Sequence, residues 1–182
     1  MIYPEKQIFA KDGRPVTLRS ARTEDAEMLI AYMKAMTLES RNLVNEPEEI
    51  SLTMEQEERF ISAHANNPRA LLLVGFSEGE HVGNASIHMI SSKQRFLHRC
   101  GLGIALYQKF WNLGIGRQMM EVLLETAKTV GYEQVELEVV ADNTAAIRLY
   151  ESLGFTICGT LPHGMKYKDG SYADMHTMIR NL

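Results

Sequence analysis

The sequence predicts an α/β protein with a mixed central β-sheet flanked by helices. Short segments with strand-like alternation and longer segments with helical spacing follow one another along the 182 residues. Late in the chain, single helices separate consecutive strands, which is typical of crossovers in an α/β sheet. The expected element order is β-α-α-β-β-β-α-β-α-β-β. We expect one domain over residues 1–182, because this length is typical of a single domain.

The first half of the chain predicts one strand and two helices before a run of strands. Residues 1–13 are polar and end in a turn signal, so no strand is expected there. Residues 16–19 alternate as a strand, and Thr23 is expected to cap the first helix. Thr53 and Gln56 have the spacing of a capping box at the start of the second helix. The next three strands are expected at residues 71–76, 82–90 and about 96–106.

The second half predicts two helices, each followed by strands. An amphipathic helix is expected from about residue 114 to 130, and residues 135–139 alternate as a strand. Asp142 or Asn143 is expected to cap a short second helix. The last two strands are expected at residues 155–160 and 172–179.

Composition argues against several classes of protein. The net charge is −4, so no broad basic surface is available for a nucleic acid. Apolar residues make up 45% of the chain, which is ordinary for a globular protein, and no apolar run is long enough to span a membrane. The two cysteines lack metal-binding spacing and are expected to be reduced thiols. The N-terminus lacks the apolar run of a signal peptide. We therefore expect a cytoplasmic protein with no metal site.

The clearest local feature is Asn112-Leu113-Gly114-Ile115-Gly116-Arg117, between an apolar strand and an amphipathic helix. Two glycines let a backbone approach a ligand closely, and a helix start offers unpaired N–H groups and partial positive charge. This turn therefore suits an anion such as a pyrophosphate. The dinucleotide fingerprint requires a small residue where this chain has Met119, and a P-loop requires Lys where it has Arg117.

A second segment follows about 25 residues later. It runs from Asn143 to Phe155 and reads Asn-Thr-Ala-Ala-Ile-Arg-Leu-Tyr-Glu-Ser-Leu-Gly-Phe. Together the two segments resemble the GCN5-related N-acetyltransferase (GNAT) superfamily, closely over residues 101–155 and by element order over almost the whole chain. Residues 169–174 are also similar to bacterial ribosomal-protein and spermidine acetyltransferases.

The resemblance implies acetyl-CoA as cosubstrate and assigns roles to matched positions. Residues 112–117 would hold the pyrophosphate through backbone N–H groups. Ile104 and Leu106 would offer backbone groups to the pantetheine and the thioester carbonyl, and Asn143 would contact the CoA arm. Tyr150 would protonate the leaving thiolate as general acid. An amine would attack the thioester directly in a ternary complex, without a covalent enzyme intermediate.

The sequence departs from the family pattern in two places. Trp111 stands where Gln or Arg is common at the start of the turn. Cys100 and Gly101 stand where many members carry a glutamate that can act as general base. His98 is a possible base, acting through water, and His88 and Glu138 are weaker candidates. A nucleophilic role for Cys100 is disfavoured, because no activating partner is visible.

The acceptor is expected to be a small or cationic primary amine. Residues 39–58 hold seven glutamates and one arginine, which form either an acidic rim for a cationic acceptor or a solvated surface. Two alternatives remain: a protein N-terminal acetyltransferase of the ribosomal-protein type, and a non-catalytic acyl-CoA-binding sensor. No nucleic acid or membrane partner is expected. By analogy with the family, the chain is expected to form a homodimer.

Overall fold

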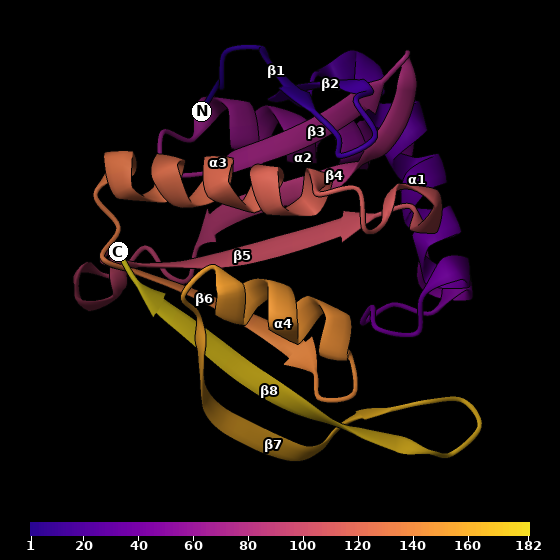
Figure 1. Cartoon of the computed structure of the whole chain (residues 1–182), viewed down its shortest axis with the longest axis vertical. Helices are drawn as coiled ribbons and strands as arrows, with labels where there is room; N and C mark the ends of the chain where they lie inside the picture. The colour runs from indigo at the N-terminus through magenta and orange to yellow at the C-terminus, as the bar shows by residue number, and fades with distance from the viewer.

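The structure, a computed structural model, describes residues 1–182 and contains one eight-stranded sheet in the order β1-β2-β3-β4-β5-β6-β8-β7 (Figure 1). All neighbouring strands are antiparallel except β5 and β6, which are parallel. The strands are β1 (Lys6–Phe9), β2 (Pro15–Ser20), β3 (Leu71–Ser77), β4 (Glu80–Met89), β5 (Arg99–Leu106), β6 (Gln134–Val140), β7 (Thr156–Lys166) and β8 (Tyr172–Asn181).

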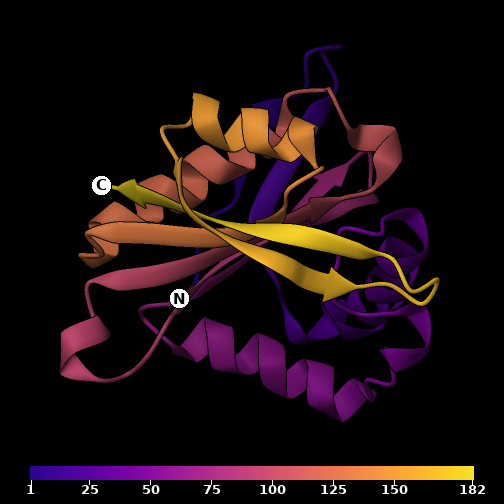
Figure 2. The same cartoon turned by 90° about the horizontal axis from the view of Figure 1, so that it is seen from below.

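Two pairs of helices cover opposite faces of the sheet, as Figure 2 shows from below. The first pair is α1 (Ala26–Glu39) and α2 (Met54–Asn66), and the second is α3 (Ile115–Val130) and α4 (Thr144–Ser152). The mixed sheet between two helical layers agrees with the predicted fold class. None of the four helices is long and apolar enough to cross a membrane.

The main core lies between the sheet and the α3/α4 layer. It contains 27 buried residues, with α3 contributing fully buried side chains such as Met119 and Leu123. A second cluster of six buried residues lies under α1 and α2. The expected capping box at α2 is present, since Thr53 Oγ1 accepts from the Gln56 N–H while the Gln56 side chain accepts from the Thr53 N–H.

The N-terminal prediction was wrong in two respects. Residues 6–9 form strand β1, which pairs antiparallel with β2, although this segment lacks a clear strand pattern. Its partner strand, rather than its own alternation, determines its conformation. Thr23 lies in a short 3₁₀ turn, and α1 begins only at Ala26. Asp25 is the N-cap residue of α1 instead. Its carboxylate accepts hydrogen bonds from the Arg22 N–H and the Arg19 guanidinium.

Other boundaries shift by a few residues. Strand β5 begins at Arg99 rather than near residue 96, because residues 94–96 form a 3₁₀ turn. Strand β7 extends to Lys166, beyond the predicted end at residue 160, because β8 pairs with it along this length.

Gly83 is a point where the sheet tolerates no side chain. Its backbone has φ 152°, and a Cβ there would lie 2.7 Å from Leu106 Cα and still closer to the Ala105 carbonyl oxygen. Both of these atoms belong to the backbone of β5, which cannot move without breaking the β4–β5 ladder.

We therefore expect Gly83→Ala to lower the free energy of unfolding by about 3 kcal/mol, measured by urea denaturation. Gly103→Ala is the matched control, because this glycine lies in the same β4–β5 ladder and a Cβ there would make only an ordinary contact, 3.8 Å from Ser86 Oγ. Its effect should stay within about 0.5 kcal/mol. Equal losses in the two variants would contradict this account of Gly83.

Candidate active site

The candidate site begins where strands β5 and β6 part. Their parallel pairing includes only three residue pairs and ends at Gly101–Glu136, although both strands continue. On the other side of β5, the Tyr107 N–H donates to the Val82 carbonyl at 3.1 Å. Because bonding alternates along an antiparallel pair, the N–H groups of Ile104 and Leu106 face away from β4. They therefore point towards β6, into the space between β5 and β6 beyond Gly101 and Glu136, and have no strand partner. We call this space the opening.

The turn before α3 offers a second set of free donors. The N–H groups of residues 112–117 donate to no acceptor in the chain; the first backbone bond of the helix joins Gln118 N–H to the Gly114 carbonyl. Asn112 (φ 62°) and Gly114 (φ 77°) both adopt the left-handed conformation that bends the backbone into this turn. A row of unpaired N–H groups at a helix start is suited to bind an anion.

Two contacts hold the turn in place. The indole Nε1–H of Trp111 donates to the Leu106 carbonyl at 2.7 Å, so this departure from the family pattern links the turn to β5. From the β1–β2 hairpin, the Lys11 N–H donates to the Leu113 carbonyl at 2.9 Å. The Lys11 side chain runs past Gly114, with Cγ only 3.3 Å from where a Cβ would lie. Lys11 therefore adds a positive charge beside the turn, and no local sequence pattern indicates this.

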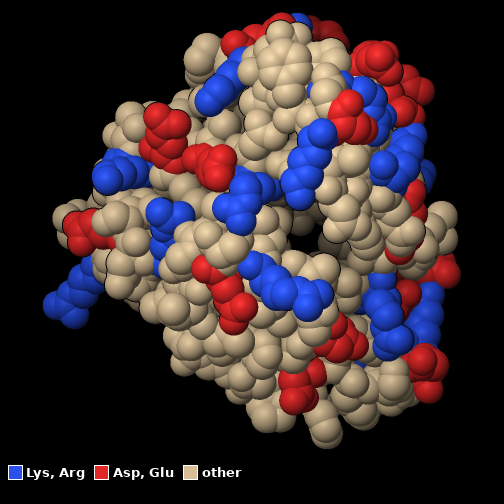
Figure 3. Space-filling view, in the orientation of Figure 1, with Lys and Arg blue, Asp and Glu red and all other residues tan.

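The end of β5, the start of α3 and α4 converge at Gly116. The nearest atoms to a Cβ at this glycine would be methyl carbons of Leu106, Leu149 and Ile104, at 3.7, 3.8 and 3.9 Å. Figure 3 shows a hollow in this region, with Lys and Arg side chains around it. The structure thus brings the predicted strand residues and the predicted turn together at one opening.

Two predicted residues lie on α4. Asn143 caps the helix, since its side-chain oxygen accepts from the Ala146 N–H at 3.3 Å. Tyr150 is only 8% exposed and packs near Phe155, with ring centroids 6.0 Å apart. Burial raises the pKa of Tyr150 to about 12, so the phenol stays protonated at neutral pH. Its hydroxyl has no hydrogen-bond partner in the chain and remains available as a donor.

Arg117 lies on the exposed surface of the first turn of α3. Its guanidinium donates to Ser152 Oγ at 2.5 Å and lies 3.8 Å from Glu121. The side chain thus crosses from α3 to α4 at the edge of the opening, and its charge is only partly compensated.

The opposite lip of the opening carries a carboxylate. Glu136 pairs with Gly101 in the β5–β6 register, which places Glu138 across from Gly103, beyond the point where the strands part. Glu138 is exposed, and it shares the α1/α2 face of β6 with Glu136, because Val135, Leu137 and Val139 occupy the core face. Arg99 neutralises Glu136 at 2.5 Å, whereas Glu138 has no ion-pair partner.

The structure does not bring His98 together with these residues. It is exposed before the start of β5, where its carbonyl accepts from the Glu133 and Gln134 N–H groups. The strand rise of about 3.3 Å per residue separates it from Leu106 by roughly 26 Å. Strand alternation placed His98 on the same face as Cys100, but it does not give the distance between His98 and the turn. This separation argues against His98 as the base.

His88, a weaker candidate base, and Cys100, the disfavoured nucleophile, also lie away from the opening, whereas Glu138, the other weaker candidate base, lies beside it. The His88 imidazole lies over Gly101, where any β5 side chain would clash with it, and burial lowers its pKa. Cys100 is fully buried, and burial raises the pKa of its thiol to about 12, which argues against a nucleophilic thiolate. No group of three or more His, Cys, Asp and Glu side chains is placed to hold a metal ion.

The glutamates of residues 39–58 are largely engaged in contacts within the chain. Lys168, at the tip of the β7–β8 hairpin, pairs with Glu48 and lies 3.6 Å from Glu46. Beside this pair, the Arg41 guanidinium stacks 3.9 Å above the Tyr167 ring centroid. We name these contacts, between residues 41–48 and 167–171, the hairpin bridge. It compensates part of the acidic charge that suggested a rim for a cationic acceptor.

Comparison with known proteins agrees with this geometry. The sequence profile of the Acetyltransferase (GNAT) family matches residues 34–155. The chain is 31% identical over 119 residues to the L-amino acid N-acetyltransferase AaaT of Escherichia coli K12, an alignment that covers 64% of this chain and 71% of that protein. It is also 48% identical over 52 residues to the [ribosomal protein bS18]-alanine N-acetyltransferase of Salmonella typhimurium, covering 29% of this chain and 35% of that enzyme.

The fold has close counterparts among solved structures. The acetyltransferase of the GNAT family from Streptococcus pneumoniae superposes with a TM-score of 0.88 at 27% identity. The superposition covers 92% of this chain and 99% of that one, which is almost the whole fold.

Proposed function

Because the chain belongs to the GNAT acetyltransferase family, and is thus an acetyl-CoA-dependent N-acyltransferase, we propose that it acetylates the α-amino group of a small amino acid-like acceptor. The observation that supports this most directly is the convergence of two sets of free N–H groups, at residues 112–117 and on β5, at one opening. Membership of an acetyltransferase family disfavours the non-catalytic acyl-CoA sensor.

In this proposal the α3/α4 side of the sheet binds acetyl-CoA. The free N–H groups of residues 112–117 hold the pyrophosphate, assisted by the charges of Lys11 and Arg117. The pantetheine arm then runs along the opening, where the N–H groups of Ile104 and Leu106 are available, and Asn143 lies beside the arm.

The chemistry takes place where the two faces meet. Glu138, the unpaired carboxylate on the opposite lip, accepts a proton from the ammonium group of the acceptor, directly or through water. The neutral amine attacks the thioester carbonyl, and a β5 N–H stabilises the oxyanion that forms. When the carbon–sulfur bond breaks, Tyr150 donates its proton to the leaving thiolate; its raised pKa keeps the phenol protonated until that step. The proton that the attacking nitrogen then loses passes through water to the Tyr150 phenolate and restores the phenol.

The hairpin bridge supports a small acceptor. One end of the bridge follows α1, whose last residue, Glu39, accepts a hydrogen bond from the Gln108 N–H just after β5. The other end leads into β8, which neighbours β6. The bridge therefore joins the two sides of the opening on the α1/α2 face and narrows access for a folded protein. The 31% identity to the L-amino acid N-acetyltransferase AaaT, over 119 residues, supports this choice.

A protein N-terminus is the second candidate acceptor. The stretch shared with the ribosomal-protein-alanine enzyme has the higher identity, although it covers only 29% of this chain. An N-terminal alanine also presents an α-amino group, so the chemistry would be the same and only access would differ.

The first experiment measures thiol release from acetyl-CoA with the L-amino acids, methionine sulfone, spermidine and a bS18 N-terminal peptide as acceptors. We expect turnover with one or more free amino acids. Tyr150→Phe and Glu138→Gln should each lower kcat by about 100-fold, since each removes a proton-transfer group.

Two matched controls should keep wild-type turnover. Tyr132→Phe removes the hydroxyl of another buried tyrosine, and Glu133→Gln neutralises an exposed carboxylate before β6. Turnover with the peptide alone would favour the second candidate. Normal kcat in Tyr150→Phe or Glu138→Gln would remove that residue from the mechanism.

Lys11 provides a separate test of the pyrophosphate site. We expect Lys11→Gln to raise KM for acetyl-CoA about 5-fold, because one charge beside the turn is lost. KM for acetyl-pantetheine, which has no pyrophosphate, should not change. Lys128→Gln, at the far end of α3, is the control. An equal effect on both thioesters would show that Lys11 does not act on the pyrophosphate.

We also propose a homodimer formed through β7. This strand is the outer edge of the sheet and is exposed along nearly all its length, including Leu161 at 63% and Ile157 at 44% exposure. An exposed apolar edge strand is prone to pair with another chain.

Sedimentation velocity at micromolar concentration should therefore show a dimer, and Leu161→Lys should convert it to a monomer. Leu38→Lys, a substitution at an exposed leucine on α1, should leave the dimer intact. A monomeric wild-type protein would refute the dimer.

A further inference from the structure

Tyr32 connects helix α1 to the strand that borders the opening. Its ring is only 2% exposed, and its hydroxyl donates to the Ala105 carbonyl oxygen at 2.6 Å. Burial raises the pKa of this phenol far above its ordinary value, so it stays protonated and can donate this hydrogen bond.

The Ala105 carbonyl belongs to the same peptide group as the Leu106 N–H. The β4–β5 register pairs Ala105 with Asn84, and the alternation set by the Tyr107–Val82 bond directs the Ala105 carbonyl towards β4. The Leu106 N–H at the other end of this peptide points into the opening. A hydrogen bond to a carbonyl oxygen polarises the peptide and strengthens its N–H as a donor.

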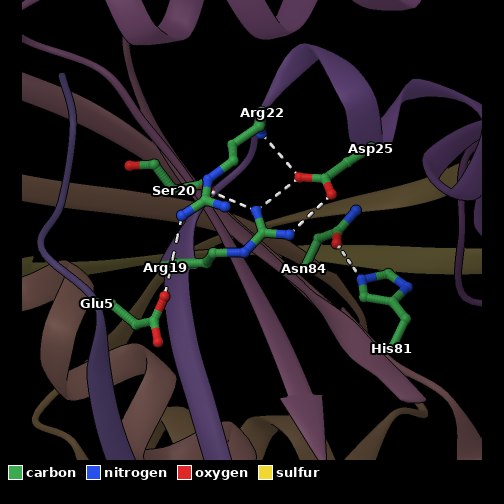
Figure 4. A network of polar contacts seen from close by, with 7 residues as sticks. All are labelled: Glu5, Arg19, Ser20, Arg22, Asp25, His81 and Asn84. Atoms are coloured by element: carbon green, nitrogen blue, oxygen red, sulfur yellow. Dashed lines mark hydrogen bonds and ion pairs between the residues drawn. The ribbon is translucent and has the colours of Figure 1, made fainter. Parts of the chain in front are cut away.

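The surroundings of Tyr32 fix its ring. His81 and Tyr107 meet it edge to face, with ring centroids 4.8 and 5.3 Å away. Burial lowers the pKa of His81, and its Nε2 lies 2.7 Å from the side-chain oxygen of Asn84. Figure 4 shows this contact beside the ion pair that Arg19 forms with Asp25, at 2.7 Å, at the start of α1. Two contacts therefore fix the surroundings of Tyr32. The Arg19–Asp25 ion pair holds the start of α1 to β2, and the contact with Asn84 fixes the His81 ring on β4.

We propose that Tyr32 is a positioning residue for the reaction, which orients and polarises the Ala105–Leu106 peptide so that the Leu106 N–H binds the acyl-CoA arm. This inference rests on the proposed function, since it assumes that acetyl-CoA enters the opening. Tyr32 itself touches neither substrate, because its hydroxyl is occupied by the peptide on the β4 side.

The chain offers a matched control. Tyr132 is also 2% exposed, and its hydroxyl also donates to a backbone carbonyl, that of Arg69, at 2.7 Å. This second tyrosine lies after α3, remote from the opening. Replacing either tyrosine by phenylalanine removes one hydrogen bond from a hydroxyl to a backbone carbonyl and keeps the aromatic ring.

The experiment compares Tyr32→Phe with Tyr132→Phe by steady-state kinetics, by calorimetric binding of CoA and by thermal unfolding. We expect similar losses in Tm but a kcat/KM for acetyl-CoA that falls about 10-fold only in Tyr32→Phe. The Kd for CoA should rise in the same variant. Equal kinetics and equal CoA binding in the two variants would overturn the proposal and leave Tyr32 a structural residue.

CoA binding separates this inference from the proposed function. If the wild-type protein binds CoA but transfers no acetyl group to any tested amine, the acceptor proposal fails while the Tyr32 comparison can still be made on Kd. If Tyr32→Phe transfers and binds as Tyr132→Phe does, the proposed function stands and the role of Tyr32 is refuted.

Discussion

The early end of the pairing between β5 and β6 is the constraint on which the site depends. Two parallel strands that separate inside a sheet leave backbone groups without partners, and buried unpaired groups are costly. The molecule satisfies one of these groups itself, since Trp111 donates to the Leu106 carbonyl. On the β4 side of the same strand, Tyr32 donates to the Ala105 carbonyl. The N–H groups of Ile104 and Leu106 are left for a ligand. The opening therefore offers backbone donors that a ligand in it can use.

The same opening explains why the two helical layers differ in character. On the α3/α4 side, glycines, free N–H groups and basic side chains surround a hollow suited to a phosphorylated ligand. On the α1/α2 side lie Glu138 and the hairpin bridge, which suit a small charged amine. The sheet separates these two environments except where β5 and β6 part. Two substrates that meet there from opposite faces can react directly, which removes any need for a nucleophile on the protein.

Local chemistry was predictable from the sequence, and long-range contacts were not. The turn at residues 112–117 and the caps at Thr53 and Asn143 depend on neighbours within a few residues, so the local sequence predicts them. Strand β1 has no alternation of its own, and it takes its conformation from β2. Lys11 and Tyr32 reach the site through tertiary packing across the chain, for which no local signal exists. The sequence alone argues against His98 as the base, because its separation from the turn along one strand follows from strand geometry.

The missing glutamate on β5 has a structural explanation in the register of the two strands. Gly101 leaves room for the His88 ring, and a carboxylate could not be accommodated there without displacing it. The carboxylates lie on β6 instead, across the opening. The register places Glu136 beside Gly101, and Glu138 follows two residues later, where the strands have parted. Arg99 neutralises the first of these carboxylates, and the second is left free where the strands have parted. A free carboxylate can therefore lie on the β6 side of the opening instead of on β5, while the unpaired donors of β5 and of residues 112–117 keep their places.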